Sequence, residues 1–320
     1  MDVDRTHSLS VVVAAWSGPE ALGRCLLALA HQLHPSDQLV VARNFDGAVP
    51  LPPLVGSAAQ VVPHVVQCDA STNVPRLRAA GLVAAGGDIV AFLEDHAEPL
   101  AGWRDAIMAA FRRGDAVDGT APRAGRAVHA VGGPVAIGAP GRAIDDAVWF
   151  YDYARFGPPL PSGVVHSLSG ANVAYDREAL LEALGDDPGS DRDGLHEASL
   201  ERALHARGRT LWLAGDAPVR VQRHESASRA IRLAHALARG FGARRAAVAR
   251  PVARVIQAVS WPLVPPLLFL RTARAAWRMP GLRGRFLRAS GWLLLLQLAW
   301  GVGEGLGSVF GVGDSDSRWR

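Results

Sequence analysis

Hydrophobic residues near the start of the chain fall into short unbroken runs with helix-like segments between them. Leu9–Trp16 and Gln38–Ala42 are apolar at nearly every position, which is typical of strands buried on both faces. Between them, Ser17-Gly18-Pro19 is a plausible helix start. Leucines then recur at helical spacing, at positions 22, 26, 29 and 33. Strands that alternate with helices predict an α/β fold with a mostly parallel sheet flanked by helices.

The same alternation continues to residue 96. Val61–Gln67 is a third possible strand, and its proline suits a sheet edge or a strand start. Pro75–Ala85 predicts a helix closed by two glycines, and Asp88–Leu93 predicts the next strand. Ligands of such sheets bind beyond the carboxyl ends of the strands. The acidic and imidazole side chains of Glu94-Asp95-His96 stand at that position.

The pattern of apolar residues is less regular between residues 128 and 214. Glycines interrupt its strand-like runs, and one stretch is rich in proline. The expected elements are a strand at Val128–Ile137, a helix at Ala143–Ala154, a loop at Phe156–Val164, a strand at His166–Tyr175, a helix at Leu195–Arg207 and a strand at Thr210–Ala214.

Charge divides the chain in two. All 34 basic side chains are arginine, and the formal net charge is +4. Residues 1–225 hold 19 Arg and 27 acids, a balance of −8, whereas residues 226–303 hold 13 Arg and no acid, a balance of +13. We therefore expect an acidic body at 1–225 and a basic tail at 226–320. A basic patch confined to the tail favours a membrane surface over nucleic acid.

Two apolar segments lie in this tail. Val255–Leu270 and Ser290–Gly303 are both shorter than the roughly 20 residues that a membrane span needs. The connection between them is rich in arginine, and the positive-inside tendency opposes a pair of spans. We expect a hairpin in the cytoplasmic leaflet of the cell membrane, with its arginines at the level of the headgroups. The alternative is a pair of helices that packs on the body or on a second subunit.

Three further features narrow the class of protein. The chain has only two cysteines, Cys25 and Cys68, so a disulfide framework is not expected. Its N-terminus carries acids before any apolar run, unlike a signal peptide. The first strand-to-helix turn, AAWSGPEAL, lacks the G-x-G-x-x-G pattern of dinucleotide-binding dehydrogenases.

Five stretches of the chain, taken in order, form a recognisable pattern. They are VVVAAWSGPEALGRCLLALAHQ, RLRAAGLVAAGGDIVAFLEDHAEPLAGW, GGPV at 132–135, SGANVAYDREAL and LHEASLERALHARGRTLWLAGDAPVRVQRH. Together they resemble the family 2 glycosyltransferases of the GT-A fold over residues 8–226. This resemblance implies transfer of a sugar from a nucleotide-diphosphate sugar to an acceptor hydroxyl, with inversion at the anomeric carbon.

The trio Glu94-Asp95-His96 falls where the family has its Asp-x-Asp signature, which grips the ribose and a divalent metal on the diphosphate. Hard cations prefer oxygen ligands, and Mn²⁺ or Mg²⁺ neutralises a departing diphosphate. Here His96 replaces the second carboxylate, and imidazole suits Mn²⁺ better than Mg²⁺. Either Asp95 and His96 share a softer metal or metal dependence is weak; a plain polar strand exit is the third possibility. The resemblance also places His224 near the metal and Arg223 near the diphosphate.

The resemblance makes Glu197 the candidate general base, because a carboxylate within reach can take the proton of an attacking hydroxyl. An acidic first helical turn, stabilised by the helix dipole, is the structural alternative. Arg43-Asn44 stands where the family usually has an Asp, so the nucleotide base stays open. The residues implied in binding the nucleotide-sugar are Ala15, Trp16, Asp69, Arg78, Glu94, Asp95, Gly170, Asn172 and Arg223.

No Gln-x-x-Arg-Trp motif follows Glu197, so a single transfer per encounter is expected. A tail held at the membrane makes a lipid-linked or cell-envelope glycan the expected acceptor. The rival hypothesis is a catalytically inactive, membrane-bound glycosyltransferase-like partner protein, favoured by the departures at His96, Glu197 and Arg43. A nucleotidyltransferase is weaker, because no glycine-and-arginine phosphate loop stands early in the chain.

Overall fold

The computed structural model describes residues 7–46, 51, 53–55, 58–115, 127–185, 194–247, 249 and 260–313. The chain forms two compact units, one of Met1–Ala136 with Pro158–Val221 and one of Ile137–Gly157 with Gln222–Arg320. This division differs from the expected boundary at residue 225, because an internal segment groups with the C-terminal helices.

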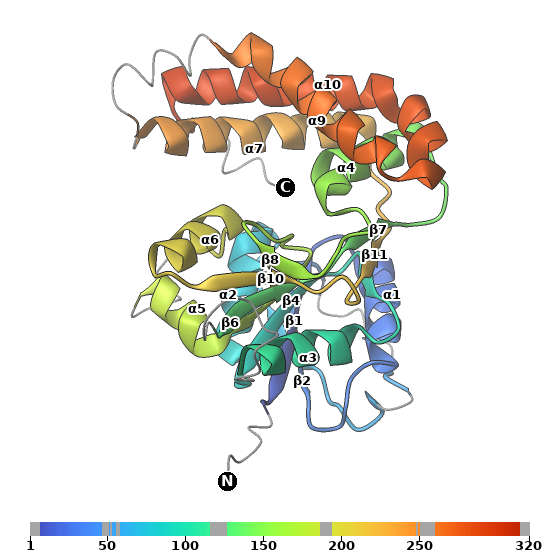
Figure 1. Ribbon diagram of the computed structural model, residues 1–320, viewed down its shortest axis with the longest axis vertical. Coiled ribbons are helices and arrows are strands. Elements are labelled where there is room, and N and C mark those ends of the chain that lie inside the picture. The colour runs from blue at the N-terminus through green and yellow to red at the C-terminus, as the bar shows by residue number, and fades with distance from the viewer. Residues whose placement is uncertain are drawn as a thin grey trace. The chain divides into compact units, whose positions relative to one another are not determined.

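The first unit is built on an eight-stranded sheet with the order β3-β2-β1-β4-β9-β6-β10-β8 (Figure 1). A second, three-stranded sheet has the order β5-β11-β7. The strands are β1 (Leu9–Ala15), β2 (Gln38–Arg43), β3 (His64–Gln67), β4 (Ile89–Glu94), β5 (Ala97–Pro99), β6 (Val128–Gly132), β7 (Val135–Ile137), β8 (Gly163–Val165), β9 (Asn172–Asp176), β10 (Thr210–Leu213) and β11 (Val219–Val221).

The strands β3, β2, β1 and β4 run parallel, and β3 lies at the end of the sheet as its proline predicted. The strand β9 is antiparallel to both β4 and β6, which makes the sheet mixed. In this register Leu93 lies opposite Asn172. The carboxyl ends of β1 and β4 and the amino end of β9 therefore meet at one edge, where the site residues are expected.

Five helices cover this sheet, and α2 lies closest to it. A Cβ added to Gly81 would come within 2.2 Å of Cγ1 of Val12, so only glycine permits this approach. Leu82 of α2, Leu180 of α5 and Leu204 of α6 share one core cluster with the sheet. The helices are α1 (Pro19–Ala30), α2 (Val74–Ala84), α3 (Trp103–Asp115), α5 (Arg177–Leu184) and α6 (Glu197–Ala206).

The second unit is helical. Its centre is Phe286, which is 2% exposed and lies edge-on to the rings of Phe150 and Trp277 at centroid distances of 5.3 and 5.8 Å. The elements are α4 (Ala143–Tyr153), η2 (Ala154–Phe156), α7 (Ala227–Ala247), η3 (Trp261–Leu263), α9 (Val264–Trp277), η4 (Pro280–Leu282) and α10 (Arg283–Phe310).

An ion-pair network explains why α4 belongs to this unit. Asp146 of α4 is 1% exposed and accepts hydrogen bonds from Nε of Arg285 at 3.1 Å and from Nη2 of Arg288 at 2.6 Å. Two arginines of the basic tail thus share one buried carboxylate from the segment expected in the body.

Among the described residues, one helical segment, Pro280–Phe310, is long and apolar enough to cross a membrane by length and composition. Half of its most apolar window is buried within the structure, and a core helix of a soluble protein can have the same length and composition. Of the other apolar segment, residues 255–259 lie outside the described part, and the remainder forms η3 and the start of α9.

Candidate active site

Arg78 joins four separate parts of the first unit. Its guanidinium donates from Nη2 to Oε1 of Glu94 at 2.7 Å and to the carbonyl of Gly170 at 3.1 Å. Its Nη1 donates to Oε1 of Glu197. Helix α2, the end of β4, the segment before β9 and the start of α6 therefore converge on one buried cation, which is 4% exposed.

Local backbone features bring Glu197 to this place. Gly194 has a positive φ of 77°, and a Cβ there would lie 2.5 Å from the carbonyl carbon of Pro75. The next residue, Leu195, donates its N–H to the carbonyl of Pro75 at 2.9 Å. The start of α6 is thereby fixed against the start of α2, with Glu197 opposite Arg78.

The electrostatics of the cluster favour a permanent cation between two carboxylates. Burial lowers the pKa of Arg78, but Glu197 and Glu94 raise it more, and the net shift is upward. Burial, and then the charge of Glu197, also raise the pKa of Tyr175 above its usual value, so the phenol stays neutral. The side chain of Glu197 is 39% exposed, so a ligand can reach it.

Asp95 holds the turn that follows β1. Its Oδ2 accepts the backbone N–H of Trp16 at 2.8 Å and that of Ser17 at 2.6 Å, and its side chain is fully buried. The ring of Trp16 meets the ring of His96 edge-on, with centroids 6.0 Å apart. The expected metal residues therefore also shape the turn after Ala15.

The fit of a divalent metal rests on Asp95 and His96. In the part of the chain that the structure describes, no three His, Cys, Asp or Glu side chains gather as a metal cluster. However, Oδ1 of Asp95 is buried without a hydrogen-bond partner and lies 3.5 Å from Nδ1 of His96. A buried carboxylate oxygen in that state fits a cation. Asp95 and His96 would hold Mn²⁺ or Mg²⁺, which supplies positive charge for a leaving diphosphate.

The remaining expected residues of the first unit differ in their surroundings. Ala15 is fully buried at the end of β1, and Asp69 is exposed just beyond β3. Asn172 is fully buried; its Oδ1 accepts from Nε1 of Trp103 at 2.8 Å and its Nδ2 donates to the carbonyl of Ala217 at 2.9 Å. The amide of Asn172 thus joins β9 to α3. Gly170 packs so closely on Glu197 that a Cβ would lie 1.8 Å from Oε1.

Arg223 and His224 belong to the second unit. Arg223 donates to Asp152 at 3.1 Å and to Glu225 at 2.9 Å, and Nδ1 of His224 lies 3.2 Å from Oδ2 of Asp145. Burial would raise the pKa of Asp145, but hydrogen bonds from Arg142 and His224 lower it overall. Whether Arg223 and His224 serve the diphosphate or the metal stays a prediction.

Two residues that support the site were not singled out from the sequence. Ser17 donates its N–H to Asp95, and its Oγ lies 3.3 Å from Nδ1 of His96. Trp103 is fully buried and fixes Asn172. The signal for Ser17 was its position just beyond a strand end, and Trp103 ends one of the stretches that carry the family resemblance.

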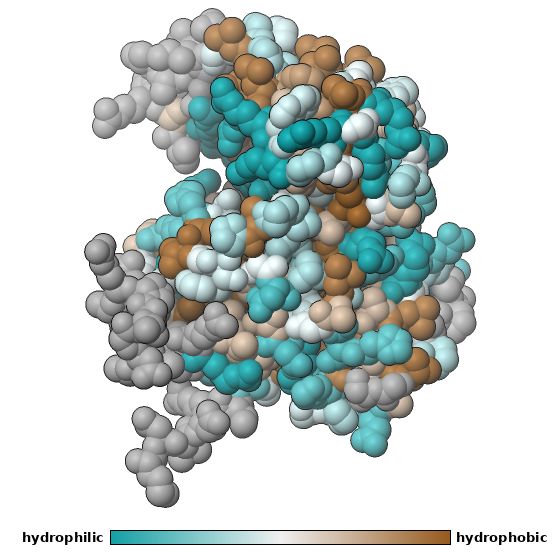
Figure 2. All heavy atoms as spheres, turned by 45° about the vertical axis from the view of Figure 1, so that its right-hand side comes forward, coloured by the Kyte–Doolittle hydropathy of each residue, from teal (hydrophilic) through white to brown (hydrophobic). Residues whose placement is uncertain are grey.

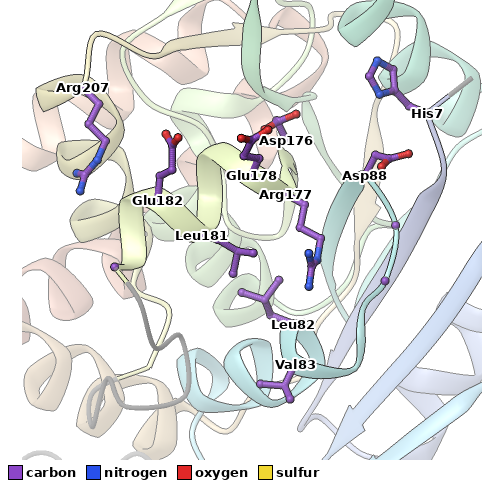
Figure 3. Close-up of a pocket in the computed structure, with 13 residues that line it drawn as sticks. His7, Leu82, Val83, Asp88, Asp176, Arg177, Glu178, Leu181, Glu182 and Arg207 are labelled. Carbon is purple, nitrogen blue, oxygen red and sulfur yellow. The ribbon is translucent and has the colours of Figure 1, made fainter. Parts of the chain in front are cut away.

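A separate cavity of about 1250 Å³ opens at the other edge of the sheet (Figure 3). Asp88, just before β4, and Asp176, at the end of β9, line it. Both carboxylates serve the fold: Asp88 accepts from the N–H and Oγ of Ser8 at 2.9 and 2.8 Å, and Asp176 caps α5. This cavity is therefore distinct from the Arg78 cluster, which lies at the opposite ends of the same two strands.

Comparison with known proteins identifies the fold. No family profile and no curated protein sequence matches the chain. Among solved structures, GalNAc-T7 with UDP, GalNAc and Mn²⁺ is 14% identical over 68% of this chain and 44% of its own, with a TM-score of 0.46, so the chain spans less than half the length of that protein. The mannosyltransferase PcManGT from Pyrobaculum calidifontis, in complex with GDP-Man and Mn²⁺, is 14% identical over 96% of this chain and 88% of its own, with a TM-score of 0.51.

The similarity to the mannosyltransferase confirms the expected fold class. The chain has a GT-A-like α/β fold, with a central sheet flanked by helices and a long apolar helix near its C-terminus.

Proposed function

We propose that this protein is an inverting, non-processive glycosyltransferase that moves a sugar from a nucleotide-diphosphate sugar to an acceptor hydroxyl. One observation carries the proposal. Arg78 binds Glu197, the candidate base, and Glu94, at the carboxyl end of β4. The two stretches expected to act on one sugar diphosphate thus lie in one cluster. The GDP-Man and Mn²⁺ bound by the similar mannosyltransferase support this class of donor.

In this proposal Glu197 takes the proton of the acceptor hydroxyl while the hydroxyl oxygen bonds to the anomeric carbon. The bond from that carbon to the diphosphate breaks at the same time, and the diphosphate leaves from the opposite face. Arg78 orients Glu197. Ala15, Trp16 and Asp69 contact the nucleotide, and Gly170 and Asn172 shape the floor beneath the donor sugar. Asp95, His96 and His224 would hold the divalent metal, and Arg223 would contact the diphosphate.

We further propose that the protein works at the cytoplasmic face of the cell membrane, on a lipid-linked or cell-envelope glycan. The support is the apolar and basic surface of the C-terminal helices, where hydrophobic and hydrophilic residues lie side by side at the top of Figure 2. Acceptor identity rests on location alone.

A panel of nucleotide-diphosphate sugars tests the proposal, each added with Mn²⁺, Mg²⁺ or EDTA. One donor should stabilise the protein by about 2.7 kcal/mol at a hundredfold excess over its Kd, and should be hydrolysed slowly. Chelation should weaken both effects. If no donor binds under any condition, the inactive partner protein becomes the better account. Release of pyrophosphate from a nucleoside triphosphate would instead indicate a nucleotidyltransferase.

The inactive alternative has one observation in its favour. Glu94 is engaged on both oxygens, since Oε1 accepts from Arg78 and Oε2 lies 3.1 Å from Nε2 of His96. Donor binding without turnover, on a broad panel of acceptors, would support that alternative.

A further inference from the structure

The hairpin of α9 and α10 carries an apolar stripe that the rest of the second unit leaves exposed. Leu263, at the end of η3, and Leu267 and Leu270, on α9, are 69%, 55% and 54% exposed, and their intervals of four and three put them on one face. On α10, Leu294, Leu298 and Val302 follow at intervals of four and are also exposed. A run of large apolar side chains on one face marks an interaction surface.

The opposite face of α10 is fully used in packing. A Cβ on Gly303 would lie 2.4 Å from the carbonyl oxygen of His235, and one on Gly307 would lie 2.0 Å from that of Arg239. Helix α10 therefore rests directly on the backbone of α7. Leu293 and Leu296 are also buried. The exposed stripe is thus the face that remains after α10 has made its contacts within the protein.

Arginines border this stripe at the turn of the hairpin. Arg271, Arg274 and Arg278 are exposed on the last turns of α9, and no described carboxylate pairs with them. Arg285 and Arg288, in contrast, both pair with Asp146. An exposed apolar face edged by unpaired guanidinium groups is complementary to a lipid surface with anionic headgroups, because guanidinium forks bind phosphate.

Spanning the membrane fits this geometry poorly. Helix α7, on which α10 rests, carries Arg232, Arg239, Arg244 and Arg245, and Arg245 pairs with Glu304 of α10 at 2.8 Å. A spanning α10 would take these charges into the hydrocarbon, where an arginine side chain is costly.

We infer that the α9–α10 stripe lies flat in a single leaflet whose headgroups are anionic, with Arg271, Arg274 and Arg278 on the lipid phosphates. This inference deepens the proposed membrane location. It does not depend on sugar transfer, because lipid binding is measured without donor or acceptor. The lipid-binding inference can therefore fail while the proposed sugar transfer holds, and the reverse.

Flotation of the full chain with vesicles provides the test, with vesicles of phosphatidylcholine alone or mixed with phosphatidylglycerol. The protein should prefer the mixed vesicles, and salt should weaken this preference. Arg274→Gln with Arg278→Gln should lower partitioning to mixed vesicles about 30-fold, at about tenfold for each 1.4 kcal/mol and about 1 kcal/mol for each arginine. Leu294→Ser with Leu298→Ser should lower partitioning to both kinds of vesicle.

Matched controls are Val83→Ser and Arg207→Gln, which change exposed residues of the first unit and should leave partitioning unchanged. Thermal unfolding shows whether each variant is folded. If the α10 double variant is not, Leu267→Ser with Leu270→Ser on α9 replaces it. Equal binding by variants and parent overturns the inference. The inference is also overturned if the protein does not bind vesicles and light scattering shows a dimer that the leucine variants dissociate. Resistance to alkaline extraction, with the two ends of α10 protected from protease on opposite sides, would show a span instead.

Discussion

The guanidinium of Arg78 donates a hydrogen bond to Oε1 of Glu197, 119 positions later in the chain. Arg78 was expected to face the nucleotide, but it is buried between this carboxylate and that of Glu94. We therefore assign Arg78 the role of orienting the side chain of Glu197. Substitutions of Arg78 and of Glu197 should therefore have different effects on stability and turnover.

Arg78→Met should lower kcat strongly and destabilise the fold by about 3 kcal/mol, because Glu94 is left buried without its cation. Arg78→Lys keeps the charge but not the fork, and should recover most of the stability and only part of kcat. Denaturant unfolding together with steady-state kinetics measures both quantities. Normal turnover by the methionine variant would remove Arg78 from the site.

Glu197→Gln should lower turnover by about 10²–10⁴-fold and leave donor binding nearly intact, since a neutral amide cannot accept the proton of the acceptor. Glu178→Gln is the control, because Glu178 is an exposed acid of α5 that lines the cavity at the other sheet edge. Calorimetry of donor binding and an initial-rate assay measure the two effects. A glutamine variant with an ordinary rate excludes Glu197 as the base.

Gly170→Ala tests the position of the base without removing it. The added Cβ would overlap Oε1, Cδ and Cγ of Glu197, all of which belong to a flexible side chain that can move away. The variant should therefore fold nearly as stably as the parent but lose turnover about as much as Glu197→Gln. Gly163→Ala, where nothing lies within 4 Å of the new Cβ, is the matched control. A large loss of stability would show that the backbone, and not Glu197, was displaced.

Asp146→Asn should destabilise the second unit by about 3 kcal/mol, because two arginines of α10 lose their shared buried carboxylate. Asp105→Asn, at a side chain 71% exposed, should change stability by less than about 1 kcal/mol. Hydrogen exchange of α4 and α10 localises the effect. Unchanged protection of both helices would contradict the prediction.

Acidification should destabilise the first unit through His129. Burial, and then Arg209, lower the pKa of His129 below its usual value, although Asp176 and Glu182 act against the shift. Both ring nitrogens face donors, namely Arg209 at 3.0 Å and the N–H of Thr210 at 3.2 Å. The unfolded chain takes up a proton below about pH 6.5, while the folded state resists it, so stability falls as pH drops through that value. His129→Gln should flatten the dependence of Tm between pH 7.5 and pH 5.5; an unchanged slope would assign the effect to another group.

The sequence predicted the first four strands and the helices α1 and α2 well, because β1, β2 and β4 are apolar runs and the leucines of α1 recur at helical spacing. It did not predict α3, which begins at the buried Trp103, or α7. It also could not show that β9 runs antiparallel to β4, since the pattern of NVAYD carries no direction. The convergence of Glu94 and Glu197 was expected from the resemblance, but the cation between them was not.

The boundary between the units shows a different limit. Residues 137–157 group with the tail through Asp146, whose partners lie 139 and 142 positions later. Local charge counts assigned that acid to the body, because they cannot tell which distant arginine it meets. Truncation near residue 225 would therefore strip α4 of Arg285, Arg288 and Phe286, and would not yield an intact body.

The carboxylate of Asp95 has a further consequence, because a single oxygen, Oδ2, accepts the N–H groups of both Trp16 and Ser17. Any ligand that draws this carboxylate outward has to loosen the first bend of the chain. Binding of such a ligand after the carboxyl end of β4 and ordering of residues 16–17 are then coupled, and each weakens the other by the same factor. A rigid resting bend sets an upper limit on the affinity for that ligand, and a looser bend would bind it more tightly.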